Sequence, residues 1–271
     1  MLGALIGDIV GSIYEFDNIK TKDFPLFQKR CFFTDDTVMT LAVADALLKG
    51  GAPDTFVRSM KEFGKLYPCA GYGGRFAGWL ISGDTRPYNS WGNGSAMRVS
   101  PCAWFAETLA DAEALAGKSA AVTHNHPEGV TGAKAAAAAI HLARSGKTKP
   151  EIRDYIERNH GYDLRRTLAE IRPVYQFNET CRETVPEAIL AFLESDGFED
   201  AIRNAISLGG DSDTLAAITG SIAEAAYRIP PEIAATAVRF LDAPLRSVLN
   251  DWLDAGLPCS DRTLYAACLR R

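Results

Sequence analysis

A helical spacing of apolar residues runs through most of this chain and restricts the folds that it can adopt. Val38, Leu41, Ala42 and Leu48 recur at steps that place side chains on one face of an α-helix. Residues 53–67, 109–122 and 128–144 also predict helices, and the last two are rich in alanine. Strand-like alternation of apolar and polar residues is almost absent. The sequence therefore predicts an all-α fold of roughly ten or more helices.

The 271 residues suit one large domain or two modest ones. Because no linker is obvious, we expect a single compact multi-helix domain over residues 1–271. Two segments resist assignment to helices: 17–33, with its charges and Pro25, and 82–96, rich in Gly, Pro, Asn and Ser. Long irregular loops in a compact helical domain are usually functional or mobile.

Composition narrows the class of protein. A hydrophobic content of 47% and a charged content of 23% are typical of soluble globular proteins. The net charge of −5 and the lack of a Lys/Arg run argue against general nucleic-acid binding. Six scattered cysteines without a C-x-x-C pair indicate reduced thiols. With no membrane-length apolar run and no basic start typical of a signal peptide, we expect a cytoplasmic monomer that does not bind membranes.

Two acidic clusters, Thr34-Asp35-Asp36-Thr37 and Gly210-Asp211-Ser212-Asp213-Thr214, each open a helix-periodic run. Helix capping alone explains one such cluster, since carboxylates are favoured in a first turn by about 0.3–1 kcal/mol each. The helix after the second cluster is apolar enough to be buried, and no Lys or Arg lies beside either cluster in sequence. Because buried carboxylates need a counter-charge, the pair predicts a divalent-metal site.

Carboxylates, hydroxyls and water are ligands for Mg²⁺, Mn²⁺ or Ca²⁺ rather than Zn²⁺. Four Asp and two Thr are enough donors for two ions. Glu15 is a further candidate, because Gly7, Gly11 and Glu15 share one helical stripe that would pack closely and end near a loop. Taken alone, Glu15 is better interpreted as a solvated carboxylate at a helix end.

Six motifs in a fixed order resemble those of the ADP-ribosylglycohydrolases, a family also described as dinitrogenase-reductase-activating-glycohydrolase-like or ADP-ribosyl-acceptor hydrolases. The resemblance covers nearly the whole chain. Its motifs are GDIVGSIYE (7–15), FTDDTVMT (33–40), AGYGGRF (70–76), SWGNGSAMRVSP (90–101), TH (123–124) and GGDSDTLAAITG (209–220).

The resemblance implies an all-α domain with a binuclear Mg²⁺ or Mn²⁺ centre in a cleft. All seven implied metal ligands are present: Glu15, Thr34, Asp35, Asp36, Asp211, Asp213 and Thr214. The implied reaction is hydrolysis of the glycosidic bond between ADP-ribose and an acceptor. The metals would bind the 2″ and 3″ hydroxyls of the distal ribose and orient a water toward C1″. Proton transfer would fall to Glu15, Asp35 or Asp36.

The same resemblance implies a set of substrate-binding residues in two glycine-rich turns and one histidine. Glycines allow close backbone approach to a diphosphate, and Trp91 offers a flat face for adenine. The structural alternatives are a tight turn with Trp91 in the core, Tyr72 as a helix cap and Arg98 as an internal salt-bridge partner. The implied substrate-binding residues are Gly71, Tyr72, Gly73, Ser90, Trp91, Gly92, Asn93, Gly94, Ser95 and His124.

The resemblance leaves the acceptor open. ADP-ribosyl-arginine on a protein is our first choice, with ADP-ribosyl-serine, a modified nucleic-acid base or a small ADP-ribose derivative as alternatives and ADP-ribose as the product. A metal-dependent phosphohydrolase would need a buried strand before Asp211, where residues 202–208 predict a helix, and no phosphate-binding P-loop motif is present. A non-catalytic relative would lack metal ligands, and this chain keeps them.

Overall fold

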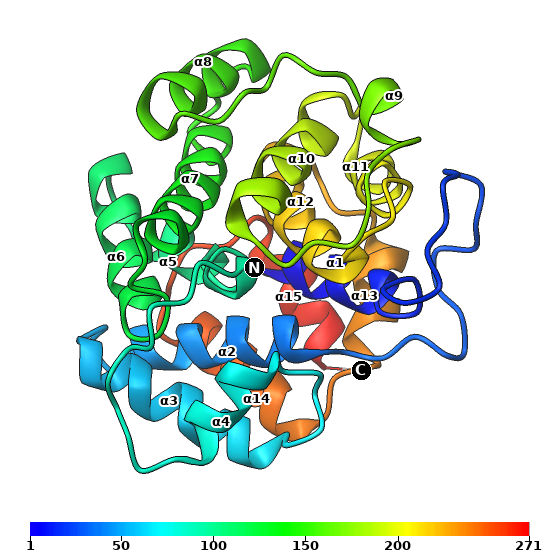
Figure 1. Cartoon of the computed structure of the whole chain (residues 1–271). Coiled ribbons are helices and arrows are strands. Elements are labelled where there is room, and N and C mark those ends of the chain that lie inside the picture. The colour runs from blue at the N-terminus through cyan, green and yellow to red at the C-terminus, as the bar shows by residue number, and fades with distance from the viewer. Residues whose placement is uncertain (271) are drawn as a thin grey trace.

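Helices make up the fold in the computed structural model, which describes residues 1–270 (Figure 1). The all-α prediction is confirmed, since the described residues contain fifteen α-helices, one 3₁₀ helix and no strand. The helices are α1 (Leu2–Gly11), α2 (Asp35–Leu48), α3 (Pro53–Leu66), α4 (Gly74–Ile81), η1 (Asn93–Ser95), α5 (Ser100–Phe105), α6 (Leu109–Ala121), α7 (Pro127–Arg144), α8 (Lys149–His160), α9 (Leu168–Ile171), α10 (Cys181–Leu193), α11 (Phe198–Ile206), α12 (Ser212–Ala226), α13 (Pro231–Val238), α14 (Ala243–Asp254) and α15 (Arg262–Leu269).

Helices α1 and α12 lie against each other at the centre of the molecule (Figure 1). Their contact is made by backbone, because α1 carries glycine at every fourth position. A Cβ added to Gly7 would lie 2.0 Å from the carbonyl oxygen of Ala216, and one added to Gly11 would lie 2.5 Å from Cα of Asp213. The glycine stripe thus brings the end of α1 to the start of α12. The helix ends at Gly11, so Glu15 lies beyond it. The prediction that Glu15 shares a helical stripe with Gly7 and Gly11 is therefore wrong.

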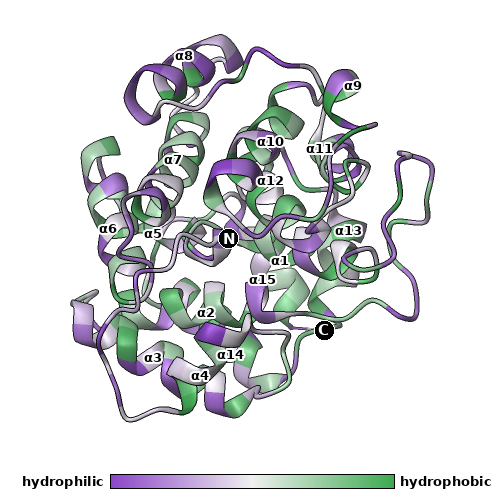
Figure 2. Ribbon diagram, in the orientation of Figure 1, coloured by the Kyte–Doolittle hydropathy of each residue, from purple (hydrophilic) through white to green (hydrophobic). Residues whose placement is uncertain are grey.

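The other helices surround this central pair in groups. In Figure 1, α2, α3, α4 and α14 lie below it, α5–α7 lie to the left, and α10 and α11 lie above it. Figure 2 shows α8 at the periphery as largely hydrophilic and α7 as mostly apolar or neutral in colour. The buried apolar side chains form one cluster that draws on most helices. A single domain over residues 1–271 accords with this core and stays a prediction.

The two segments without predicted helices are irregular, except for η1 at the end of the second. The first is anchored by Asn18, whose side chain exchanges hydrogen bonds with the backbone of Gly210 at 2.9 and 2.7 Å. No helix among residues 1–270 combines the length and apolar character that a membrane span requires.

Burial predicts very different reactivities for the cysteine thiols. Cys69 is exposed, whereas Cys102 and Cys181 are buried. Burial raises the pKa of both buried thiols to about 12, and the thiolate is the form that alkylating reagents attack. We therefore expect iodoacetamide at pH 8 to modify Cys69 in the native protein and to spare Cys102 and Cys181, as read by peptide mass spectrometry. Modification of Cys102 at the rate of Cys69 would contradict this burial.

Candidate active site

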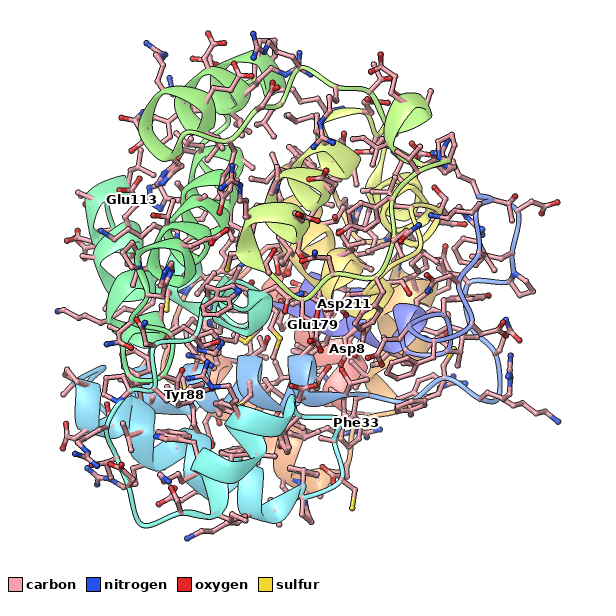
Figure 3. The ribbon with its side chains drawn as sticks, in the orientation of Figure 1. Asp8, Phe33, Tyr88, Glu113, Glu179 and Asp211 are labelled. Carbon is pink, nitrogen blue, oxygen red and sulfur yellow. The ribbon has the colours of Figure 1, made fainter. Side chains whose placement is uncertain are left out.

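The two acidic clusters meet where the N-terminal ends of α2 and α12 face each other. Asp35 and Asp36 occupy the first turn of α2. Asp211 is the N-cap residue of α12, and Asp213 lies in the first turn of that helix. The Thr214 hydroxyl donates a hydrogen bond of 3.1 Å to Oδ2 of Asp36, 178 positions away in the chain. Figure 3 shows Asp211 at the centre of the molecule, close to the α1 residue Asp8 in this view.

Five of these carboxylates line one cavity: Glu15, Asp35, Asp36, Asp211 and Asp213. Among residues 1–270 no ion pair joins any of them to a Lys or Arg. Burial raises the pKa of every one, and neighbouring carboxylates raise most of them further. The pKa of Asp211 rises to about 6 and that of Glu15 to about 8. The charged form of the cluster is therefore costly without a cation.

The donor atoms fit a divalent cation. One oxygen from each of Glu15, Asp211 and Asp213 lies within 4.8 Å of the others, a spacing that a shared ion can bridge. Oδ1 of Asp36 is buried and has no hydrogen-bond partner within the described chain, although an unsatisfied buried acceptor costs about 1–3 kcal/mol. All the donors are hard oxygens, which suit Mg²⁺ or Mn²⁺. The residues therefore fit the metal chemistry that their sequence pattern predicted.

Asp8 is a buried carboxylate of this region that sequence reasoning did not single out. It accepts hydrogen bonds from the backbone N–H and hydroxyl of Thr34, at 2.9 and 2.7 Å, and from the N–H of Thr37 at 3.0 Å. These bonds hold the first turn of α2, and they turn the hydroxyl of Thr34 toward Asp8. Thr34 is not among the residues that line the cavity. The position of Asp8 inside the apolar run of α1 could have indicated a buried, functional carboxylate.

The two glycine-rich turns form the walls beside the carboxylates. The predicted substrate-binding residues on the cavity surface are Gly71, Gly73, Ser90, Gly92, Asn93, Gly94 and His124. Gly71 has a φ of +101°, and the carbonyl of Ala70 before it accepts the N–H of Asp35 at 2.8 Å. The Asn93 side chain donates a 2.7 Å hydrogen bond to Asp211 Oδ2, which ties the second turn to the start of α12.

Three predicted substrate-binding residues do not line the cavity. Ser95 is buried behind its wall, where its hydroxyl bonds the carbonyl of Gly129 at 2.8 Å. Trp91 is half-exposed and packs edge-on against His126, and Tyr72 packs against Phe76. The two structural alternatives for Trp91 and Tyr72 are not met either, because Trp91 lies outside the core and Gly73 is the N-cap residue of α4.

A buried cation lies at another part of the same cavity. Arg98 is 1% exposed and donates to the carbonyl of Ser119 at 2.9 Å and the hydroxyl of Thr123 at 2.8 Å. No ion pair engages Arg98 among residues 1–270, so the internal salt bridge considered from the sequence is absent there. Burial lowers its pKa only to about 10, which leaves Arg98 charged at neutral pH.

Thr123 links Arg98 to the neighbouring His124 through two hydrogen bonds. Thr123 accepts from Arg98, so its own hydroxyl proton is free to donate to Nδ1 of His124 at 2.7 Å. Burial and the charge of Arg98 hold the pKa of His124 well below its ordinary value, so the ring is neutral. When Thr123 donates, the proton of the neutral ring is on Nε2, which lies 3.4 Å from the position of a Cβ on Gly94. The cavity thus has hydrogen-bond donors and a cation away from its carboxylates.

The cavity includes residues that the sequence did not assign to the site. They are Gly74, Arg75, Phe76, Tyr88, Met97 and Glu179. Gly74, Arg75, Phe76 and Met97 belong to the motifs at residues 70–76 and 90–101. Their neighbours in these motifs had been predicted to bind substrate. Glu179 lies in the irregular segment before α10, and no pattern pointed to it.

Comparisons with known proteins agree with this architecture. The family model described as ADP-ribosylglycohydrolase matches residues 1–259. The ADP-ribosylarginine hydrolase Tri1 of Pseudomonas putida (strain GB-1) is 31% identical, over 86% of this chain and 71% of that protein. The human ADP-ribosylhydrolase ARH3 is 28% identical over 84% of each chain. A solved structure described as an ADP-ribosylglycohydrolase-related protein complex superimposes with a TM-score of 0.68 at 25% identity, covering 99% of this chain and 96% of that one.

Proposed function

The chain belongs to the ADP-ribosylglycohydrolase family, and we propose that it is a metal-dependent hydrolase that releases ADP-ribose from arginine on modified proteins. One observation carries this proposal. Among residues 1–270, a single cavity combines carboxylates that form no ion pair with Lys or Arg, a buried Arg98 that forms no ion pair with a carboxylate, and a neutral His124. A metal-bound ribose and an anionic diphosphate are the two parts of a ligand that would complement these two regions.

Bound Mg²⁺ or Mn²⁺ would supply the counter-charge of the carboxylates and a Lewis acid for ribose hydroxyls and water. The protein's own residues would do the remaining work. Asp211, held by Asn93, and Asp36, held by Thr214, present fixed carboxylates where positive charge develops on the ribose. His124 would donate its Nε2 proton to a phosphate oxygen. Asp36 is buried, whereas Glu15 and Asp35 are half-buried. Of these two, we propose Glu15 as the group that exchanges a proton with solvent, because its pKa of about 8 lies near neutral pH.

The arginine acceptor is supported by the relative from Pseudomonas putida, which is an ADP-ribosylarginine hydrolase. The use of two metal ions, a cytoplasmic location and a monomeric state are further parts of the proposal. Serine-linked or base-linked ADP-ribose would replace arginine as the substrate if those compounds are cleaved faster.

The test is release of ADP-ribose from a panel of substrates by the purified, chelator-stripped protein. We expect cleavage of an ADP-ribosyl-arginine peptide after addition of Mg²⁺ or Mn²⁺ and none with chelator present. Faster cleavage of serine-linked or base-linked ADP-ribose would change the acceptor and keep the reaction. Binding of ADP-ribose with no cleavage of any substrate would overturn the hydrolase proposal in favour of a binding protein.

A further inference from the structure

Glu179 is a carboxylate on the cavity surface that is separate from the metal-binding group. Its oxygens are not part of the set within 4.8 Å formed by Glu15, Asp211 and Asp213. Its negative charge nevertheless acts on Glu15, whose pKa it helps to raise. In Figure 3 Glu179 lies at the centre of the molecule, near the labels of Asp211 and Asp8.

No side chain among residues 1–270 pairs with the carboxylate of Glu179, although its backbone is held in place. Among residues 1–270 neither an ion pair nor a hydrogen bond engages its side chain, which is exposed. The carbonyl of Glu179 accepts a hydrogen bond from the N–H of Asn93 at 2.8 Å. Two residues further on, the N–H of Cys181 donates to the carbonyl of Trp91 at 3.1 Å. An exposed carboxylate on an anchored stretch of backbone beside the cavity is available for a cationic ligand.

Two exposed phenyl rings lie close in the chain to Glu15 and to Glu179, one ring beside each carboxylate. Phe16 directly follows Glu15, and Phe177 precedes Glu179 by two residues. The rings stack with their centroids 5.9 Å apart and their planes at 24°, although Phe16 is 85% exposed and Phe177 is 42% exposed. The pair therefore bridges the two segments that carry Glu15 and Glu179 and leaves aromatic surface facing solvent.

We propose that Glu179, Phe16 and Phe177 form an acceptor subsite that selects the guanidinium group of ADP-ribosyl-arginine. This inference rests on the proposed function. A guanidinium is planar and cationic, pairs with a carboxylate through two N–H groups and stacks on aromatic rings. A serine acceptor offers neither the charge nor the plane. Glu179 is here a specificity-determining residue that contacts the departing acceptor.

The position of these residues accords with the direction in which the acceptor must lie. The bond to be broken joins the acceptor to the ribose that the carboxylate group would hold. Glu15 belongs to that group, and Phe16 is its neighbour. The diphosphate would lie toward Arg98 and His124, so the acceptor would lie on the side of Glu15 and Glu179.

The test compares Glu179→Gln with Glu232→Gln, a matched loss of one exposed carboxylate on α13, away from the cavity and from both phenyl rings. Two substrates are used with Mg²⁺: an ADP-ribosyl-arginine peptide and ADP-ribose linked to p-nitrophenol, whose leaving group carries no guanidinium. We expect Glu179→Gln to raise KM for the arginine substrate by about tenfold with little change in kcat. The KM of Glu179→Gln for the nitrophenol substrate should stay within about twofold of wild type. The KM values of Glu232→Gln for both substrates should do the same.

Two further measurements separate recognition from a structural effect. Phe177→Ala should raise KM for the arginine substrate by about threefold, since a cation–aromatic contact at an exposed site is modest. The effect of Glu179→Gln should shrink in 0.5 M NaCl, because salt screens exposed charges. Equal losses on both substrates, or no loss on either, would overturn the acceptor subsite. If wild type cleaves neither substrate, the proposed function itself fails.

Discussion

Replacing Asp213 by asparagine should lower ADP-ribose release by about a hundred- to a thousandfold and should also make the metal-free protein more stable. The loss of activity follows because Asp213 belongs to the group of three carboxylates whose oxygens lie within 4.8 Å. The gain in stability follows because Asp213 is buried and raises the pKa of Asp35, Asp36 and Glu15. Removing its charge relieves repulsion that a bound cation would otherwise offset.

The stability of the metal-free wild type should fall as the pH rises. Asp211 has its pKa raised from 3.8 to about 6, and Glu15 from 4.5 to about 8. Between the unfolded and folded values the native state binds more protons than the unfolded state, so the free energy of unfolding decreases with pH. The melting temperature without metal should therefore decline from about pH 4 to about pH 8. Added Mg²⁺ should raise it more at pH 8 than at pH 5.

Melting curves of wild type, Asp213→Asn and Asp251→Asn, with Mg²⁺ and with chelator, check both effects. Asp251 is exposed on α14 and serves as a matched control for the loss of one carboxylate. We expect the Mg²⁺-dependent rise in melting temperature in wild type and Asp251→Asn, and a much smaller rise in Asp213→Asn. An unchanged Mg²⁺ response in Asp213→Asn would show that this carboxylate does not hold metal.

Gly7→Ala should destabilise the protein by about 3 kcal/mol or more, at or above the upper end of the usual range for overpacking. The added Cβ would lie 2.0 Å from the carbonyl oxygen of Ala216 and 2.2 Å from its carbon. Both atoms belong to the backbone of α12, so no side chain can rotate away. The two central helices would have to separate, which would also displace Asp213 from Asp8 and Asp36.

Gly78→Ala provides the control for this prediction. Gly78 lies inside α4, and nothing lies within 4 Å of the position its Cβ would take. Alanine is the better helix former by about 1 kcal/mol, so this change should stabilise the protein slightly. Urea unfolding of both variants gives the comparison. Equal stability of Gly7→Ala and wild type would contradict the backbone contact between α1 and α12.

The sequence predicted the helical class and the meeting of the acidic clusters for different reasons. The helical class follows from periodicity, which is a local property. The meeting of Asp36 with Thr214 follows from charge, because two buried acidic helix starts need a common counter-ion. Glu15 was placed correctly beside them, although α1 ends at Gly11 and a turn carries Glu15 onward. That end was hidden because Ser12–Tyr14 continue the buried pattern.

The direction of individual side chains was harder to predict. Ser95 and Trp91 share a motif with Gly92 and Gly94. Of these four residues, the two glycines line the cavity and the other two do not. Adjacent residues in a tight turn point to different sides, and motif membership does not say which. Asp8 acts through hydrogen bonds to a segment 26 residues away, and Glu179 reaches the cavity through tertiary packing. Neither arrangement leaves a local pattern in the sequence.

The contact between α1 and α12 cannot form during translation until α12 has been synthesised. Helix α1 is buried along its whole length in the native structure, and its main partner follows roughly 200 residues later. At a translation rate of about 5–20 residues per second, α1 would wait roughly 10–40 s before α12 is made. During that interval its apolar surface is open to aggregation or to capture by chaperones. The carboxylate group cannot assemble earlier, because Asp211 and Asp213 arrive with α12.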